Sequence, residues 1–284
     1  MKNIRIIPKI DIKGPNLVKG IHLEGLRVLG SPRKFAQLYY ESGADELIYM
    51  DVVASLYNRN SILNMIKETA RQIFIPLTVG GGLRTLDDIK NALRAGADKV
   101  SLNTAAIKNP KIISEASKKF GSSTILVVIE AIKQPNGEYM AFIENGREFT
   151  GKEAISWAKE VEKLGAGEIM LTSVDKEGTG LGYDIELTKA VVESVSIPVI
   201  ACGGPGKLED IEDVIKNGKA DAVCISSMLH YHAIEDGRKV SASKKSSEGN
   251  FEFLKTNQKF GKIKPATIPE IKKYLFGKNI NCRI

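Results

Sequence analysis

Short runs of apolar, often β-branched residues alternate along the chain with longer segments whose apolar residues recur at helical spacing. Continuous apolar runs of about four to eight residues are typical of strands buried on both faces, and the longer segments predict amphipathic helices. Eight strands are expected, over Ile4–Ile10, Leu47–Asp51, Pro76–Val79, Lys99–Leu102, Ile125–Ile129, Glu168–Thr172, Pro198–Ala201 and Asp221–Ile225. The helices are expected over Arg33–Ser42, Ser61–Gln72, Leu86–Ala95, Lys111–Phe120, Glu153–Leu164, Ile185–Ser194, Leu208–Asn217 and Ile268–Phe276.

This repeated strand–helix order predicts parallel strands covered by helices. Eight such units favour a closed α/β barrel, the (β/α)8 or TIM barrel, over an open sheet, and no expected strand has the polar sequence of an edge. A barrel of this kind fills about 250 residues or more. We therefore expect residues 1–284 to form one barrel.

The two halves of the chain resemble each other. Ile75–Gly82 returns in altered form as Ile197–Gly204, and a Leu-Asp/Glu-Asp-Ile helix start follows each copy. A repeat of this length is too long for a solenoid. It fits a barrel built from two half-barrels of four units each.

Two segments interrupt the regular pattern. Residues 132–149 contain Pro135-Asn136-Gly137 between short alternating runs, which predicts a hairpin inserted in the fifth βα loop. Residues 231–265 are polar, rich in Lys and Ser, and form an insertion before the last helix. Loops of this length are either functional or unstructured, and the sequence leaves both open.

The formal net charge of +7 comes largely from lysines near the C-terminus, namely Lys239, Lys244, Lys245, Lys255, Lys259, Lys262 and Lys264. No nucleic-acid motif accompanies them, and phosphorylated small molecules would explain a basic rim as well, so we expect no nucleic-acid partner. No stretch approaches the roughly 18 apolar residues of a membrane span. The first residues lack the apolar run of a secretory signal, so a cytoplasmic protein without membrane contact is expected.

Metal and cofactor binding have little support in the sequence. Cys202, Cys224 and Cys282 lack the spacing of metal ligands, and two of them lie in expected strands as buried thiols. The three histidines, His22, His230 and His232, are too scattered for a triad or a metal site. We expect neither a metal nor a cofactor.

Barrel enzymes carry their chemistry at the carboxyl ends of the strands. Glycines stand there before a helix at matching positions of the two halves, where backbone N–H groups and the helix dipole favour an anion. Hydroxyl and amide side chains end the next strand in each half. We expect two phosphate sites, the first at Gly81, Gly82, Asn103 and Thr104 and the second at Gly203, Gly204, Ser226 and Ser227.

Two carboxylates, Asp11 and Glu130, end the first and fifth expected strands. Across a barrel mouth they could divide acid and base roles if their surroundings separate their pKa values. Each could instead pair with a nearby lysine such as Lys13, Lys19 or Lys133.

Together these motifs resemble the family of the cyclase subunit of imidazole glycerol phosphate synthase, a barrel of histidine biosynthesis. The resemblance covers residues 1 to about 230 and the last helix. It is carried by Arg5-Ile6-Ile7-Pro8 with Asp11, Val18-Lys19-Gly20, Thr78–Gly82, Gly96–Val100, Asn103–Ala106, Gly165–Ile169, Leu171–Ser173 and Gly178-Thr179.

The resemblance implies a lyase that accepts ammonia from a glutaminase subunit docked at the amino-terminal face of the barrel. The substrate would be a bis-phosphorylated ribulosyl aminoimidazole carboxamide, and the products imidazole glycerol phosphate and aminoimidazole carboxamide ribotide. Asp11 matches the main acid/base residue, Lys19 lies on the family's mobile first loop, and Gly178 joins the second phosphate site. An ammonia gate matches Arg5, Glu46, Lys99 and Glu168, and Asp98 matches a position that docks the glutaminase.

Four departures leave an alternative open. Glu130 stands where the family has Asp, Lys9 where it has Cys, and Glu177 where it has Asp, and residues 231–265 extend the catalytic rim. Related barrels relay ammonia to a sugar amidotransferase of surface-polysaccharide synthesis, and a retained gate with an altered acid pair would suit such a relay. The related barrel isomerase of the same pathway fits less well, because it needs no glutaminase gate.

Overall fold

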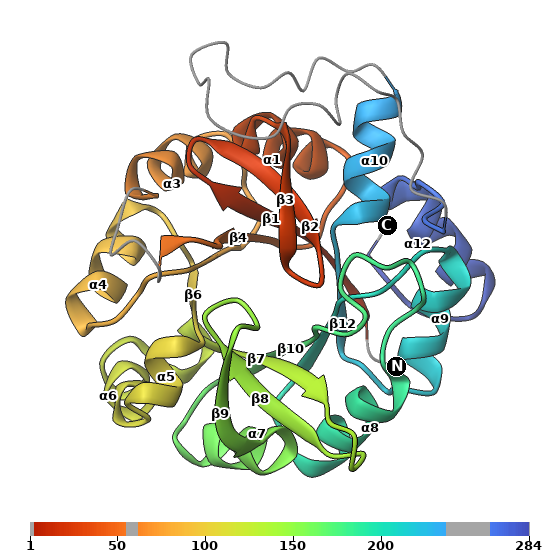
Figure 1. Cartoon of the computed structure of the whole chain (residues 1–284). Coiled ribbons are helices and arrows are strands. Elements are labelled where there is room, and N and C mark those ends of the chain that lie inside the picture. Colours follow the sequence, from red (N-terminus) through yellow and green to blue (C-terminus); the bar gives the residue numbers. More distant parts are fainter. Residues whose placement is uncertain (1–2, 55–61, 237–261, 284) are drawn as a thin grey trace.

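Eight parallel strands close into a ring at the centre of the molecule (Figure 1). The computed structural model describes residues 3–54, 62–236 and 262–283. In ring order the strands are β1 (Arg5–Lys13), β4 (Leu47–Asp51), β5 (Leu77–Gly80), β6 (Lys99–Leu102), β7 (Ile125–Lys133), β10 (Glu168–Ser173), β11 (Val199–Cys202) and β12 (Ala222–Ile225). β12 pairs in parallel with β1 and closes the ring. The expected (β/α)8 barrel is confirmed.

Helices surround the barrel on its outside (Figure 1). They are α1 (Pro32–Glu41), α3 (Leu63–Ala70), α4 (Leu86–Ala95), α6 (Lys111–Phe120), α7 (Ala154–Lys163), α8 (Ile185–Ser194), α9 (Leu208–Lys216) and α12 (Ile268–Gly277). Three further helical segments were not expected, α5 (Thr104–Lys108), the 3-10 helix η1 (Ser122–Thr124) and α10 (Ser227–Glu235). Two of them, α5 and α10, start directly after a barrel strand, so their amino ends face the barrel mouth.

Two antiparallel hairpins lie over the carboxyl ends of the strands (Figure 1). One adds β8 (Tyr139–Ile143) and β9 (Glu148–Glu153) to β7, in the region where the sequence predicted a hairpin. The other, β2 (Asn16–Ile21) and β3 (Glu24–Gly30), occupies the first βα loop and was not predicted. Both hairpins carry side chains and backbone groups to the same face as the strand ends.

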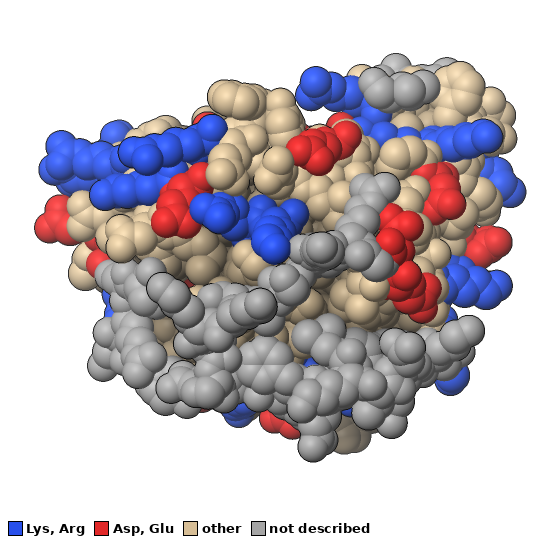
Figure 2. Space-filling view, turned by 90° about the horizontal axis from the view of Figure 1, so that it is seen from above, with Lys and Arg blue, Asp and Glu red and all other residues tan. Residues whose placement is uncertain are grey.

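The expected insertion at residues 231–265 is only partly described. Tyr231 and the following residues to Glu235 complete α10, and residues 237–261 lie outside the described residues. The chain resumes at Lys262, and the Lys264 N–H donates a hydrogen bond to the Gly206 carbonyl at 2.7 Å. On the face shown in Figure 2, basic and acidic side chains lie interspersed.

Strand alternation divides the core into two layers. Ile6, Ile10 and Ile12 of β1 face outward into the layer between strands and helices. Ile7 faces inward and joins a second cluster that fills the barrel, made of Ile7, Ile48, Leu126, Val128, Met170, Ile200, Cys202, Ala222 and Cys224. Residues at odd positions of β1 therefore point into the barrel.

Three aspartates that lie just before barrel strands, Asp45, Asp98 and Asp221, have a structural role. Asp45 Oδ2 accepts a hydrogen bond from the Ile6 N–H at 2.7 Å, Asp98 Oδ2 from the Leu77 N–H at 2.8 Å, and Asp221 Oδ2 from the Val199 N–H at 2.6 Å. Each carboxylate thus satisfies a backbone donor at the start of a neighbouring strand.

The helices of the described ranges include none with the length and apolar character needed to cross a bilayer. Within the same ranges, no group of three or more His, Cys, Asp or Glu side chains is placed to hold a metal ion.

The hydrogen bonds that cap the amino end of α12 allow a test of what stabilises the last helix. Thr267 Oγ1 accepts from the Glu270 N–H at 3.2 Å, and Glu270 Oε2 accepts from the Thr267 N–H at 2.7 Å. We expect Thr267→Ala to lower the free energy of unfolding by about 1 kcal/mol, measured by urea denaturation. Ser31→Ala is the matched control, because Ser31 caps α1 without a side-chain hydrogen bond. Equal losses in the two variants would contradict this account.

Candidate active site

The two expected catalytic carboxylates come from opposite sides of the ring. Asp11 lies on β1 and Glu130 on β7, with β4, β5 and β6 between them on one side and β10, β11 and β12 on the other. Asp11 is 3% exposed and points into the barrel, as its odd position on β1 requires. Both residues lie near the carboxyl ends of their strands, where a barrel places its chemistry.

Lys9 also points into the barrel and pairs with Asp11. Its Nζ lies 2.8 Å from Asp11 Oδ1, and the two side chains are each 4% exposed. Burial lowers the pKa of Lys9, but the negative charges of Asp11 and Glu177 outweigh this and raise it well above its ordinary value. Lys9 is therefore a permanent cation at the barrel mouth.

A second buried cation reaches the same place from the β2–β3 hairpin. Lys19 Nζ lies 3.9 Å from Asp11 Oδ2 and forms a closer ion pair with Glu177, which follows β10. Burial opposes ionisation of Glu177, but Lys19 and Lys9 hold the pKa of this carboxyl below its ordinary value. The sequence singled out Lys19, and the structure adds Glu177 as its partner.

Glu130 has different surroundings. It is partly buried, and its Oε2 accepts a hydrogen bond from the Gly146 N–H at 2.8 Å. Burial raises the pKa of Glu130 to about 7, against the opposing effects of this hydrogen bond and of Lys9, and the Asp11 charge adds to the rise. Near neutral pH this carboxyl can therefore hold or release a proton, as a general acid must.

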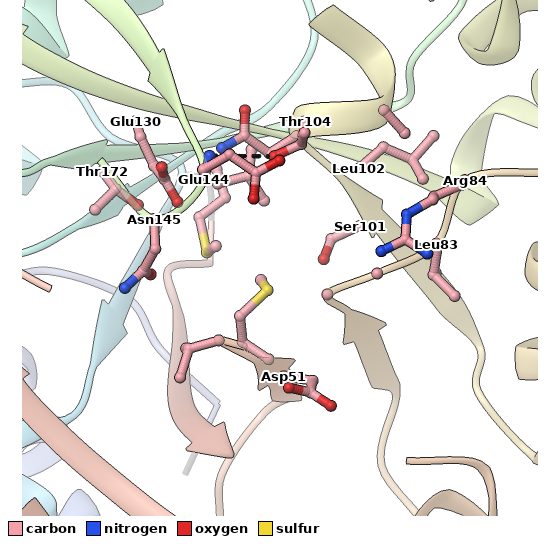
Figure 3. A pocket seen from close by; sticks show the side chains of 18 of the residues that line it. Asp51, Leu83, Arg84, Ser101, Leu102, Thr104, Glu130, Glu144, Asn145 and Thr172 are labelled. Carbon is pink, nitrogen blue, oxygen red and sulfur yellow. Dashed lines mark hydrogen bonds between the residues drawn. The ribbon is translucent and has the colours of Figure 1, made fainter. Parts of the chain in front are cut away.

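The first expected phosphate site lines a pocket of about 360 Å³ at the barrel mouth (Figure 3). Gly81, Gly82, Asn103 and Thr104 all line it, and so does Glu130. Two cations not singled out by the sequence, Arg84 and Lys108, belong to the same wall. The pocket therefore combines backbone donors, hydroxyl and amide groups and positive charge, which together suit a phosphate group.

The tip of the β8–β9 hairpin forms another wall of this pocket. Glu144, Asn145 and Gly146 there all have positive φ values, 54°, 62° and 77°. The Glu144 N–H donates to Thr104 Oγ1 at 3.3 Å, and Lys108 Nζ lies 3.3 Å from Glu144 Oε1. Figure 3 shows Glu144 beside Thr104 and Asn145 nearer Glu130. The sequence did not single out these residues as part of a site, although Asn145-Gly146 is a turn signal.

The glycines of both expected sites are required by close backbone contacts. Gly81 has φ 93°, and a Cβ atom there would lie 2.1 Å from the Asp51 carbonyl oxygen. Gly204 has φ 118°, and its Cβ would lie 2.0 Å from the Gly182 carbonyl oxygen. Packing alone therefore excludes larger residues at these positions.

The second expected phosphate site lies outside the first pocket. Ser226 and Ser227 are buried at the start of α10, and Ser226 Oγ donates to the Lys9 carbonyl at 3.0 Å. Gly203 lies beside Glu177, since a Cβ there would meet Glu177 Oε2 at 3.0 Å. Gly178 packs against the Gly20 backbone of the β2–β3 hairpin. Gly178 and Gly203 thus lie beside the Lys19–Glu177 pair, and none of the residues of this second site lines the first pocket.

Four charged side chains meet at the opposite, amino-terminal face. Arg5 contacts Glu46 at 2.6 Å and also pairs with Glu168. Lys99 Nζ lies 3.0 Å from Glu46 Oε2 and 3.1 Å from Glu168 Oε2. We call Arg5, Glu46, Lys99 and Glu168 the charge quartet. The structure brings all four together, as expected.

Asp98, which precedes Lys99, is exposed on this same face. Its carboxylate is bonded to the start of β5, so it has a structural partner whether or not another subunit contacts it.

Known proteins resemble this chain over most of its length. A family described as "Histidine biosynthesis protein" matches residues 5–235. Imidazole glycerol phosphate synthase subunit HisF of Legionella pneumophila is 57% identical over 210 residues, covering 74% of this chain and 99% of its own. The subunit HisF of Prochlorococcus marinus is 50% identical over 232 residues, covering 81% and 90%. That of Trichormus variabilis is 47% identical over 234 residues, covering 81% and 91%. The chain thus belongs to the histidine biosynthesis protein family, among the subunits HisF of imidazole glycerol phosphate synthase.

Proposed function

We propose that this chain is the cyclase subunit of imidazole glycerol phosphate synthase. It uses ammonia from a glutaminase subunit to convert a bis-phosphorylated ribulosyl aminoimidazole carboxamide into imidazole glycerol phosphate and aminoimidazole carboxamide ribotide. The observation that carries the proposal is that Glu130 lines a pocket with the donors for a phosphate group, while Asp11, from the opposite strand of the ring, pairs with Lys9, which lines the same pocket.

The two carboxyl groups have the surroundings needed for opposite roles. Forming carbon–nitrogen bonds from ammonia releases protons, and expelling a leaving group requires one. Asp11, flanked by the cations Lys9 and Lys19, is placed to accept protons as a carboxylate. Glu130, with a pKa raised by burial to about 7, is placed to donate one. Acid and base are thus separated by environment.

The substrate would be held at its two phosphates. One binds at Gly81, Gly82, Asn103 and Thr104, where Arg84 and Lys108 add positive charge. The other binds at Gly178, Gly203, Gly204, Ser226 and Ser227, beside the amino end of α10. Anchoring both ends fixes the reacting atoms over the barrel mouth, and correct placement of this kind lowers the barrier of the reaction.

Ammonia would enter at the charge quartet and travel along the inside of the barrel. The apolar cluster inside the barrel consists of aliphatic and sulfur-containing side chains, and the hydroxyl groups of Thr78 and Ser101 share the inner face of the strands with it. Such a lining favours neutral ammonia over ammonium, because moving a charge into an apolar interior is costly. The glutaminase subunit would dock at the amino-terminal face, where Asp98 and the quartet are located.

The alternative, an ammonia relay to a sugar amidotransferase, rests on Glu130 and on residues 231–265. Most of that insertion lies outside the described residues. Glu130 is held at the pocket by the Gly146 N–H, so the longer side chain still presents a carboxyl group to the mouth. This arrangement favours the cyclase. A chain that transmits ammonia from glutamine but never converts the carboxamide would favour the relay.

Turnover by the purified chain is the direct test. With ammonium salts and the bis-phosphorylated carboxamide, imidazole glycerol phosphate should form, and Asp11→Asn should lower kcat by about a thousandfold through loss of the base. Asp175→Asn is the matched control, because Asp175 follows β10 on the same rim and bonds the Lys133 N–H at 2.8 Å. No product from the unmodified chain under any ammonia source would disprove the proposed function.

The acid role of Glu130 predicts the alkaline limb of the pH–rate profile. Glu130 must be protonated to donate, so kcat should fall as pH rises above about 7, where the raised pKa of Glu130 lies. Glu130→Gln should lose about a hundredfold in kcat and lose this limb. Steady-state kinetics from about pH 5 to about pH 9, roughly two units on either side of the pKa of Glu130, would measure this limb. A profile that keeps rising beyond pH 8 would assign the acid role to another group.

The charge quartet can be tested with one variant. Arg5→Met leaves Glu46 and Glu168 sharing only Lys99, so the ring of ion pairs opens. We expect the ratio of glutamine-dependent to ammonium-dependent turnover to fall about tenfold, equivalent to about 1.4 kcal/mol. Arg33→Met, which breaks an exposed pair with Glu68, should leave the ratio unchanged. An equal ratio in Arg5→Met and unmodified protein would exclude a gating role.

A further inference from the structure

Lys9 is a charged side chain in a place where an apolar one would cost less. It points inward from β1 beside the aliphatic cluster of the barrel and is 3% exposed. Burying an ammonium group costs several kcal/mol unless close opposite charge repays it. A buried ion pair is therefore weak support for stability, and the effect of Lys9 should be sought in the charge of its partner.

Asp11 is that partner. Positions 9 and 11 lie two residues apart on one strand, so both side chains point into the barrel. Lys9 Nζ lies 2.8 Å from Asp11 Oδ1. Lys19, the other cation near Asp11, is 3.9 Å from Oδ2 and is engaged more closely by Glu177. Lys9 is thus the cation in closest contact with the Asp11 carboxylate.

The other titratable groups around Lys9 act on it more weakly than Asp11 does. Cys202 and Cys224 face it from β11 and β12, and Glu177 acts on it from the loop after β10. His230 of α10 is neutral, because burial lowers its pKa to about 3, and its Nδ1 lies 2.5 Å from the Tyr39 hydroxyl. Glu130 receives only a longer-range effect from Lys9, since its bonded partner is the Gly146 N–H.

We propose that Lys9 is a positioning residue that holds Asp11 ionised and in one orientation, so that Asp11 is committed to the base role and Glu130 to the acid role. The division into base and acid rests on the proposed function, but the effect of Lys9 on the Asp11 carboxylate can be measured whether or not the chain turns over substrate. A cation 2.8 Å from one carboxylate and farther from the other favours ionisation of the first. Two carboxyl groups at one mouth are thereby made unequal.

Carboxyl titration by NMR tests the electrostatic content in the full chain, active or not. With 13C-labelled aspartate, the Asp11 signal is assigned by its loss in Asp11→Asn. In Lys9→Met its titration midpoint should rise by about one to two pH units, while Lys9→Arg should stay near the unmodified protein. Lys13→Met, which removes an exposed lysine from the end of the same strand, should cause no change. An unchanged Asp11 midpoint in Lys9→Met would overturn the proposal. If Lys9→Met does not fold, Lys9→Gln makes the same comparison.

Kinetics then tests the positioning role separately. Lys9→Met should lower kcat by about ten- to a hundredfold, with KM within about twofold, because a displaced base is misaligned with substrate that still binds. The acidic limb of its pH–rate profile should move to higher pH, and Lys9→Arg should restore it. A loss of kcat with an unmoved acidic limb would show a merely structural role and contradict the proposal. If the unmodified chain is inactive but the Asp11 midpoint still rises in Lys9→Met, the cyclase function is disproved and the coupling between Lys9 and Asp11 stands.

Discussion

Side-chain alternation in a closed ring of eight strands decides which residues meet at this site. Every second residue of a barrel strand must point inward, and the interior of an eight-stranded barrel is only wide enough for side chains to fill it. On β1 this places Ile7, Lys9 and Asp11 on the inner face, one above the next. A charge at such a position has little contact with water, so it needs a partner on its own strand or on a neighbouring element. The pairing of Lys9 with Asp11 follows from this constraint.

The same constraint explains how much the sequence could predict. Parallel strands of a barrel end at one face, so residues at the expected strand ends, such as Asp11, Glu130 and Thr104, could be assigned to one mouth before their distances were known. The direction of Lys9 could not be assigned in this way. A lysine can extend along an apolar surface and keep its charged end in water, and only the register of β1 against β4 and β12 excludes that here.

The contacts that the two hairpins make could not be predicted from the sequence, for a different reason. Gly146 donates to Glu130 because β8 pairs with β7 in a register that sets Glu130 opposite Phe142 and places the hairpin tip over the pocket. A slip of one residue would turn every side chain of β8 to the other face. The sequence marks Asn145-Gly146 as a turn, but it does not state which register the strands adopt. Lys19 and Glu177 meet for a similar reason. Lys19 lies on the β2–β3 hairpin in the first βα loop, which the hydrophobic pattern of the sequence did not predict.

Charge balance shows why Glu130 in particular should exchange a proton. At the amino-terminal face, Arg5 and Lys99 balance Glu46 and Glu168. At the mouth, the two buried cations Lys9 and Lys19 balance Asp11 and Glu177 in the same way. Glu130 belongs to neither balanced set, and ionising it adds a negative charge beside the neutral set of Lys9, Lys19, Asp11 and Glu177. Its ionisation is opposed by burial and by the Asp11 charge, and it is favoured by the Gly146 N–H, by the Asn103 side chain and by the more distant charge of Lys9. A carboxyl group in that position gains and loses its proton at little cost near neutral pH.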